Sequence, residues 1–194
     1  MQELISTLTI WALPVLFAIT LHEAAHGYAA RHFGDSTAER AGRISLNPLR
    51  HIDPMGTVVV PALIVAVSTL SGGSPMLFGW AKPVPVDFGR LRHPKADMLW
   101  VAAAGPFANL VMALCWAMLF RFAIMSPENV YALPLAKMAD AGMQINAVLM
   151  LLNLLPIPPL DGGRIAVSLL PAGPAYTFSR LEPYSFPILL VLLF

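Results

Sequence analysis

The chain of 194 residues has little charge and almost no cysteine. Charged residues make up 12% of it and the formal net charge is +1, so the composition does not indicate a nucleic-acid partner. Cys115 is the one cysteine, which excludes a disulfide framework and a cysteine-based zinc site. It lies in an apolar run, and we expect it to be a small buried hydrophobic residue. No internal repeat, low-complexity tract or second domain is recognisable, so 1–194 is predicted to be a single integral membrane domain.

Apolar residues are abundant. They make up 57% of the chain, and the mean hydropathy is +0.69, which is typical of an integral membrane protein. The first apolar stretch has neither a basic leader nor a small-residue cleavage site, so we expect a retained span and not a signal peptide. The predicted fold is an all-α polytopic helical bundle with a three-helix core. Its spans are expected at about 4–30, 98–120 and 141–160, with a partial last span from about 186.

The region between the first two spans contains two segments of other kinds. Residues 58–70 are apolar, but at about 1.5 Å per residue they are too short to cross comfortably, so a re-entrant or interfacial segment is expected. Residues 78–86 contain prolines that favour an extended edge strand, which could pair with an unwound substrate segment, although a plain interfacial loop is equally compatible. His51 and Asp53 lie beside prolines. They could bind a metal ion or contact a substrate, but the neighbouring prolines favour a role in holding a turn.

An H-E-x-x-H motif occupies residues 22–26, near the end of the first apolar stretch. On a helix, His22 and His26 lie on one face and can reach a single metal ion. Glu23 lies about 100° further round, where its carboxylate can touch a metal-bound water without being a ligand. Three ionisable groups within an apolar span are costly unless they have a function. The motif therefore predicts a zinc hydrolase site with Glu23 as the base.

The second half of the third predicted span is irregular. Pro156, Pro158 and Pro159 cannot continue a regular helix, and irregular backbone at membrane depth is tolerated where protein or a watery cavity covers it. Asp161 follows, and it could be a third zinc ligand or part of an Asp-Gly-Gly turn. The presence of the H-E-x-x-H motif in the same chain favours the role of Asp161 as a zinc ligand. Asn109 is a polar residue within the second span, so its side-chain amide requires a hydrogen-bond partner inside the bundle. We expect it to belong to the site.

The basic residues indicate the orientation of the chain. Eight of the twelve Lys and Arg residues fall between the first two clear spans: Arg31, Arg40, Arg43, Arg50, Lys82, Arg90, Arg92 and Lys95. The positive-inside bias places this region in the cytoplasm. His22, His26 and Asp161 would then all lie near the inner ends of their spans, close to the cytoplasmic face of a multi-pass cell-membrane protein.

Three motifs together resemble the site-2 protease family of intramembrane zinc metalloproteases: HEAAH at 22–26, AGPFAN at 104–109, and NLLP to LDGG at 153–163. The segments around 47–54 and 79–86 resemble its compact prokaryotic branch, which lacks PDZ and CBS domains. The resemblance implies one zinc held by His22, His26 and Asp161, with Glu23 as general base. It also implies cleavage of a transmembrane helix within the bilayer, and a role for Asn153 in holding the substrate or the oxyanion.

Two other functions use the same residues. A membrane metal-binding or transport protein could use the cluster as a transit site, and a catalytically silent scaffold is the third possibility, which the intact Glu23 disfavours. For the protease, the expected partners are a transmembrane protein substrate and the lipid bilayer. The candidate substrate-binding residues are Asn153, Asn109, Pro83 and Val84.

Overall fold

The computed structural model describes residues 2–60, 63–64, 67 and 82–184, and within these it is helical. The α-helices are α1 (Gln2–His32), α2 (Thr37–Arg40), α4 (Pro94–Ile124), α5 (Ala132–Asn153), α6 (Asp161–Leu169) and α7 (Ala172–Ser179). The short helical turns are η1 (Pro48–Arg50), η2 (Pro54–Val59, a π-helix), η3 (Phe88–Arg90) and η4 (Glu182–Tyr184). The predicted all-α bundle is confirmed.

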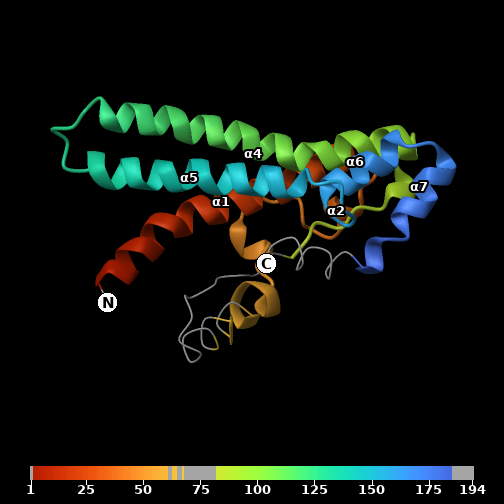
Figure 1. Ribbon diagram of the computed structural model, residues 1–194, viewed down its shortest axis with the longest axis horizontal. Coiled ribbons are helices and arrows are strands. Elements are labelled where there is room, and N and C mark those ends of the chain that lie inside the picture. The colour runs from red at the N-terminus through yellow and green to blue at the C-terminus, as the bar shows by residue number, and fades with distance from the viewer. Residues whose placement is uncertain (1, 61–62, 65–66, 68–81, 185–194) are drawn as a thin grey trace.

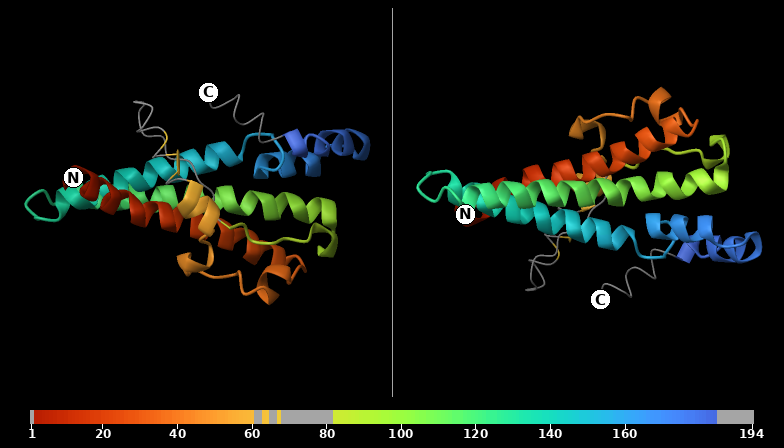
Figure 2. Two further views of the ribbon diagram at one scale, coloured as in Figure 1. Left: turned by 90° about the horizontal axis from the view of Figure 1, so that it is seen from below. Right: turned by 90° about the horizontal axis from the view of Figure 1, so that it is seen from above.

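Helices α1, α4 and α5 lie side by side and form the body of the bundle (Figures 1 and 2). The most extensive packing is between α4 and α5, and α1 packs against both. The α4–α5 loop and the N-terminus lie towards one end of the bundle, while α2, α6 and α7 lie at the other (Figure 1). Three long helices thus supply a scaffold, and short elements gather at one end of it.

Two helices of the described chain are long and apolar enough to cross a membrane. The most apolar 18-residue stretches of α4 and α5 have mean hydropathies of 1.8 and 1.2. Large apolar side chains of these helices are exposed, as expected of a surface that contacts lipid; they include Phe107, Leu114, Met118, Phe122, Val148 and Leu151. Cys115 is exposed on α4, so the expectation that it is buried was wrong. Apolar residues of such a helix can face outward as well as inward, since the lipid is as apolar as the core.

The ends of the long helices follow from local sequence. Helix α1 ends at His32, two residues before Gly34, whose φ of +111° favours glycine. The Asp35 and Gly34 amides donate to the carbonyls of Ala30 and Arg31 at 2.9 and 3.1 Å. Helix α4 begins with Pro94 in its first turn, where the missing N–H costs nothing. Helix α5 differs from the predicted span at 141–160, because it begins at Ala132 and ends at Asn153, before the prolines.

Among the described residues no strand is assigned, and 82–87 run without regular structure, so the predicted extended β stretch is not seen there. Its first residues, 78–81, most of the apolar segment at 58–70 and the predicted partial span from about 186 lie outside the described residues. Asp53 accepts hydrogen bonds from the Met55 and Gly56 amides at 2.9 and 2.8 Å, in the turn role expected of it. His51 contacts the Ser45 carbonyl through Nε2 at 2.8 Å.

Backbone hydrogen bonds hold segment 82–87 against the end of the bundle. The Lys82 amide donates to the His51 carbonyl at 2.9 Å, and Arg43 Nη2 donates to the carbonyls of Lys82 and Pro83 at 2.7 and 3.5 Å. The Asp87 amide donates to the carboxylate of the buried Asp35 at 2.7 Å. Burial opposes ionisation of Asp35. The hydrogen bonds that its carboxylate accepts from Thr37 and from the Asp87 amide outweigh burial and hold the pKa of the carboxyl below its ordinary value.

Candidate metal centre

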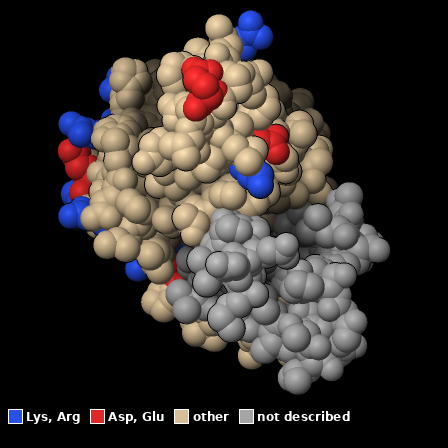
Figure 3. Space-filling view, turned by 90° about the vertical axis from the view of Figure 1, so that its left-hand side faces the viewer, with Lys and Arg blue, Asp and Glu red and all other residues tan. Residues whose placement is uncertain are grey.

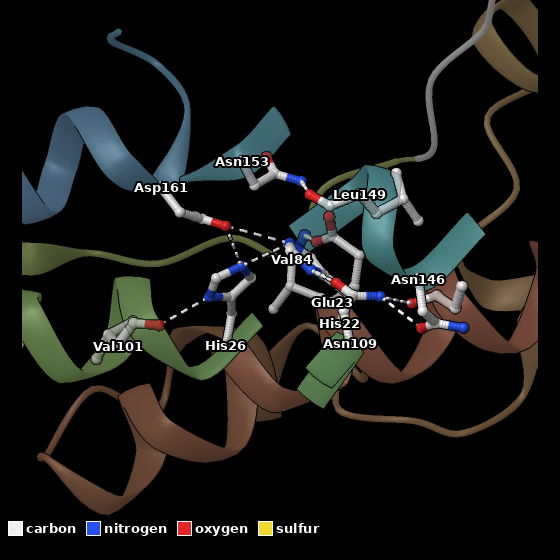
Figure 4. A network of polar contacts seen from close by, with 11 residues as sticks. His22, Glu23, His26, Val84, Val101, Asn109, Asn146, Leu149, Asn153 and Asp161 are labelled. Atoms are coloured by element: carbon white, nitrogen blue, oxygen red, sulfur yellow. Dashed lines mark hydrogen bonds and ion pairs between the residues drawn. The ribbon is translucent and has the colours of Figure 1, made fainter. Parts of the chain in front are cut away.

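Three side-chain atoms from two distant parts of the chain, α1 and the start of α6, converge at one point. Nε2 of His22 and Nε2 of His26 lie 3.2 and 3.3 Å from Oδ2 of Asp161, and 3.1 Å from each other (Figure 4). Both histidines come from α1, one turn apart, and Asp161 is the first residue of α6. In the part of the chain that the structure describes, this is the one group of three such residues able to hold a metal ion. The structure thus brings together the three residues predicted to be ligands.

The other ring nitrogen of each histidine is held by an acceptor on α4. Nδ1 of His22 lies 2.5 Å from Oδ1 of Asn109, and Nδ1 of His26 lies 2.7 Å from the Val101 carbonyl oxygen. Since both oxygens only accept, each Nδ1 carries the proton and donates it. With the proton on Nδ1, it is Nε2 of each imidazole that is turned towards the cluster, as is usual for a metal-bound histidine.

Three acceptor atoms facing one another at this distance repel unless a cation lies between them. Oδ2 of Asp161 is buried and has no hydrogen-bond donor among the described residues, as expected of an atom reserved for an ion. Tetrahedral zinc, with bonds of about 2.0–2.2 Å, separates neighbouring donors by about 3.3 Å, which is close to the observed spacing. The residues therefore fit zinc, and three protein ligands leave a fourth position for water.

Gly105 of α4 makes room for the cluster. A Cβ placed there would lie 2.6 Å from Cε1 of His22 and still closer to Nε2 of His26. Any larger residue would push the imidazoles out of position. The glycine of the AGPFAN segment is thus required by the close approach of α4 to the two histidines.

The irregular segment 154–160 places Asp161. It leaves α5 at Asn153 and returns the chain to the start of α6, where Gly163 packs directly against its backbone. A Cβ on Gly163 would lie 2.5 Å from the Pro158 nitrogen and 2.6 Å from the Ile157 carbonyl carbon. The Asp-Gly-Gly sequence therefore begins a helix that carries the carboxylate, and the glycines allow this helix to pack tightly.

The three predicted ligands and Glu23 line one cavity of about 160 Å³. The carboxylate of Glu23 accepts a hydrogen bond from the Val84 amide, with Oε2 2.7 Å from the nitrogen (Figure 4). Segment 82–87 thus touches the predicted base directly. This contact could not be anticipated from the sequence, because it joins residues far apart in the chain.

Of the predicted substrate-binding residues, Asn153, Pro83 and Val84 line the cavity. The side-chain amide of Asn153 donates to the Leu149 carbonyl at 3.0 Å. Asn109 is not among the lining residues; it is fully buried behind His22, so its position suits orienting the imidazole rather than contacting substrate.

Two residues that the sequence analysis did not select also belong to the site. Arg164 is the one arginine or lysine among the described residues that line the cavity, and its guanidinium lies 5.0 Å from the ring centroid of Phe88. Asn146 of α5 is fully buried and hydrogen-bonded to Asn109. The signal that indicated Asn109, an amide inside an apolar span, applies equally to Asn146.

Comparisons with known proteins identify relatives named as zinc metalloproteases. The family model of Peptidase family M50 matches residues 122–194. A Bacillus subtilis (strain 168) protein named "Putative zinc metalloprotease YwhC" is 35% identical over 196 residues, which cover 97% of this chain and 81% of that protein. Proteins named "Putative zinc metalloprotease Rip2", from Mycolicibacterium smegmatis and Mycobacterium tuberculosis, are 36% and 31% identical over 76% of this chain. The matched part spans about half (52%) of each Rip2. No solved structure matches the chain.

Proposed function

Because this chain belongs to the site-2 protease family of zinc metalloproteases, peptidase family M50, we propose that it hydrolyses peptide bonds within or near the membrane-spanning segments of other membrane proteins. The observation that supports the proposal most directly is the convergence of His22, His26 and Asp161 beside Glu23 in one cavity. These three residues are the proposed zinc ligands. The zinc, when bound, supplies a Lewis acid and lowers the pKa of its water towards neutrality.

Glu23 is the proposed general base. It lines the same cavity as the ligands but is not one of them, and the Val84 amide holds one carboxylate oxygen, Oε2, in place. The carboxylate accepts the proton of the attacking water and then passes it to the nitrogen of the departing amine. A fixed orientation favours both transfers, since each requires hydrogen-bond distance between the carboxylate and the reacting atom.

Segment 82–87, which contacts Glu23 through the Val84 amide, is the proposed substrate-binding wall of the cavity. Of its N–H groups, those of Lys82, Val84 and Asp87 are already bonded within the protein, and Pro83 and Pro85 have none. Strand-like pairing with an unwound substrate is thereby limited to the Val86 N–H and to the carbonyls of Val84, Pro85 and Val86, since the Asp87 carbonyl already accepts from the Arg90 amide at 3.0 Å. Asn153 lies on the same cavity and is proposed to hold the substrate carbonyl.

In the proposed topology α1, α4 and α5 each cross the membrane, and the metal centre faces the cytoplasm. The end of the bundle opposite α6, seen in Figure 3, has a mostly uncharged surface where the described residues are visible. The basic residues between α1 and α4 lie on the connection at the metal-centre end. This asymmetry follows the positive-inside rule.

The test compares wild type with Glu23→Gln in detergent, using a single-span substrate protein and measuring zinc content. Glu39→Gln, at an exposed glutamate on α2, is the matched control. We expect wild type and the control to cleave, and Glu23→Gln to keep one zinc but lose turnover by at least about a hundredfold, the scale of lost acid–base catalysis. Cleavage by Glu23→Gln at the wild-type rate would refute the proposed base. Zinc uptake into proteoliposomes without cleavage would favour a transport protein.

A further inference from the structure

A chain of buried amides crosses the bundle from α5 to the metal centre. Asn146 on α5 bonds to Asn109 on α4, which bonds to His22 on α1 (Figure 4). Both asparagines are fully buried, and His22 is 7% exposed. Three helices therefore share one polar contact path, and the path ends on a proposed zinc ligand.

The direction of each hydrogen bond in this chain follows from the backbone carbonyl at its far end. The Gly142 carbonyl can only accept, so Nδ2 of Asn146 faces it, at 2.8 Å. Oδ1 of Asn146 is then turned to Asn109 and accepts from its Nδ2 at 2.9 Å. Asn109 in turn presents Oδ1 to His22, and the proton must lie on Nδ1 of the imidazole.

If the Asn109 side-chain amide were flipped, His22 would have to adopt its other tautomer. Its NH₂ group would then face Nδ1 of His22, which would have to accept, and the proton would move to Nε2. A protonated Nε2 has no lone pair for a metal. Apart from Asn146, Nδ2 of Asn109 donates to the Ala18 carbonyl, and this contact is longer, at 3.3 Å. The shorter bond to Asn146 is thus the stronger constraint on the orientation of the amide.

We propose that Asn146 is a positioning residue for the metal centre: through Asn109 it holds His22 in the tautomer that binds zinc. The inference rests on the proposed zinc ligands. Hydrogen-bonding partners beyond the first ligands typically affect metal affinity by about 10- to 100-fold. A hydrogen bond between membrane helices, in contrast, contributes little on average to stability. A purely structural role would therefore change thermal stability, whereas a positioning role changes zinc affinity.

The experiment measures zinc affinity by competition with a chromogenic chelator, using the purified full chain in detergent, alongside thermal unfolding of the zinc-free protein. Asn146→Leu removes the acceptor for Asn109 at similar volume, and we expect affinity to fall at least about tenfold. Asn146→Asp keeps an oxygen facing Asn109, and its buried carboxyl is expected to be neutral and able to donate to Gly142. Its affinity should therefore stay within about threefold of wild type.

Two controls separate this inference from the proposed site. Thr20→Val alters a buried polar residue of α1 outside the chain of amides and should leave zinc affinity unchanged. His26→Ala should abolish zinc binding; if it does not, the proposed ligands and the inference both fail. If His26→Ala loses zinc but Asn146→Leu binds it as tightly as wild type, or Asn146→Asp loses as much as Asn146→Leu, the positioning role alone is refuted. If Asn146→Leu does not fold, Asn146→Ser replaces it. The serine side chain is too short to reach Asn109, so the same loss of zinc affinity is expected.

Discussion

The two walls of the cavity at the candidate metal centre are built in different ways. One wall consists of helices α1 and α4, and its histidines are fixed from behind by Asn109 and the Val101 carbonyl. The other consists mainly of segment 82–87, which has no regular secondary structure. Segment 82–87 is held through its backbone, by bonds to His51, Arg43 and Asp35.

The difference matches the chemistry proposed for each wall. Zinc ligands need fixed side-chain directions, which helices packed through buried hydrogen bonds provide. A substrate-binding wall needs backbone groups that are not used up by a helix or sheet, and irregular segments supply them. Changes to the helical wall should therefore affect zinc binding, and changes to the irregular wall should affect catalysis at constant zinc.

The largest expected effect comes from Gly105→Ala on the helical wall. The added methyl group would occupy the space of the His22 and His26 rings, so we expect loss of zinc and of all proteolysis. Zinc content per chain measured by atomic absorption checks this. Gly173→Ala is the matched control, since nothing lies within 4 Å of a Cβ at that position. Full zinc occupancy in Gly105→Ala would contradict the described packing.

A smaller effect is expected from Arg43→Ala on the irregular wall. The guanidinium holds the carbonyls of Lys82 and Pro83, next to the Val84 amide that binds Glu23. Its loss should lower kcat/KM by about tenfold through misplacement of the wall, while zinc content stays at the wild-type value. Arg40→Ala, at an exposed arginine nearby, should have no effect. A loss of zinc in Arg43→Ala would mean that the two walls are not independent.

The smallest effect is expected from Asp35→Asn, which weakens the anchor of Asp87. At neutral pH the ionised carboxylate accepts bonds from Thr37 and Asp87, so the substitution should cost about 1–2 kcal/mol of stability. Because the pKa of Asp35 is lowered by folding, its contribution is present above the unfolded-state pKa of about 3.9 and is lost as pH falls through the folded value. Thermal unfolding between pH 7 and 3 should show the difference from wild type shrinking. Asp140→Asn, at an exposed aspartate, is the control; a difference that grows towards low pH would contradict the role of Asp35.

The sequence was sufficient to predict the helical bundle and the residues that meet at the cavity. Hydropathy marks the long helices because an apolar environment demands apolar surface, and the H-E-x-x-H spacing follows from the helical repeat. The prolines after Asn153 correctly indicated that no regular helix continues to Asp161. The helices and the H-E-x-x-H spacing depend on residues that are close together in the chain, whereas the pairing of Asp161 with His22 and His26 was predicted from the motifs taken together.

Other features were decided only by tertiary packing. The hydrogen bond from Val84 to Glu23, the place of Asn109 behind His22 and the contact of Asn146 with Asn109 all join distant segments. Cys115 was predicted to be buried and is exposed, because an apolar run does not reveal which of its faces meets another helix and which meets lipid. Local sequence determines where a helix forms, whereas the rotation of one helix against another determines which polar atoms come within hydrogen-bonding distance.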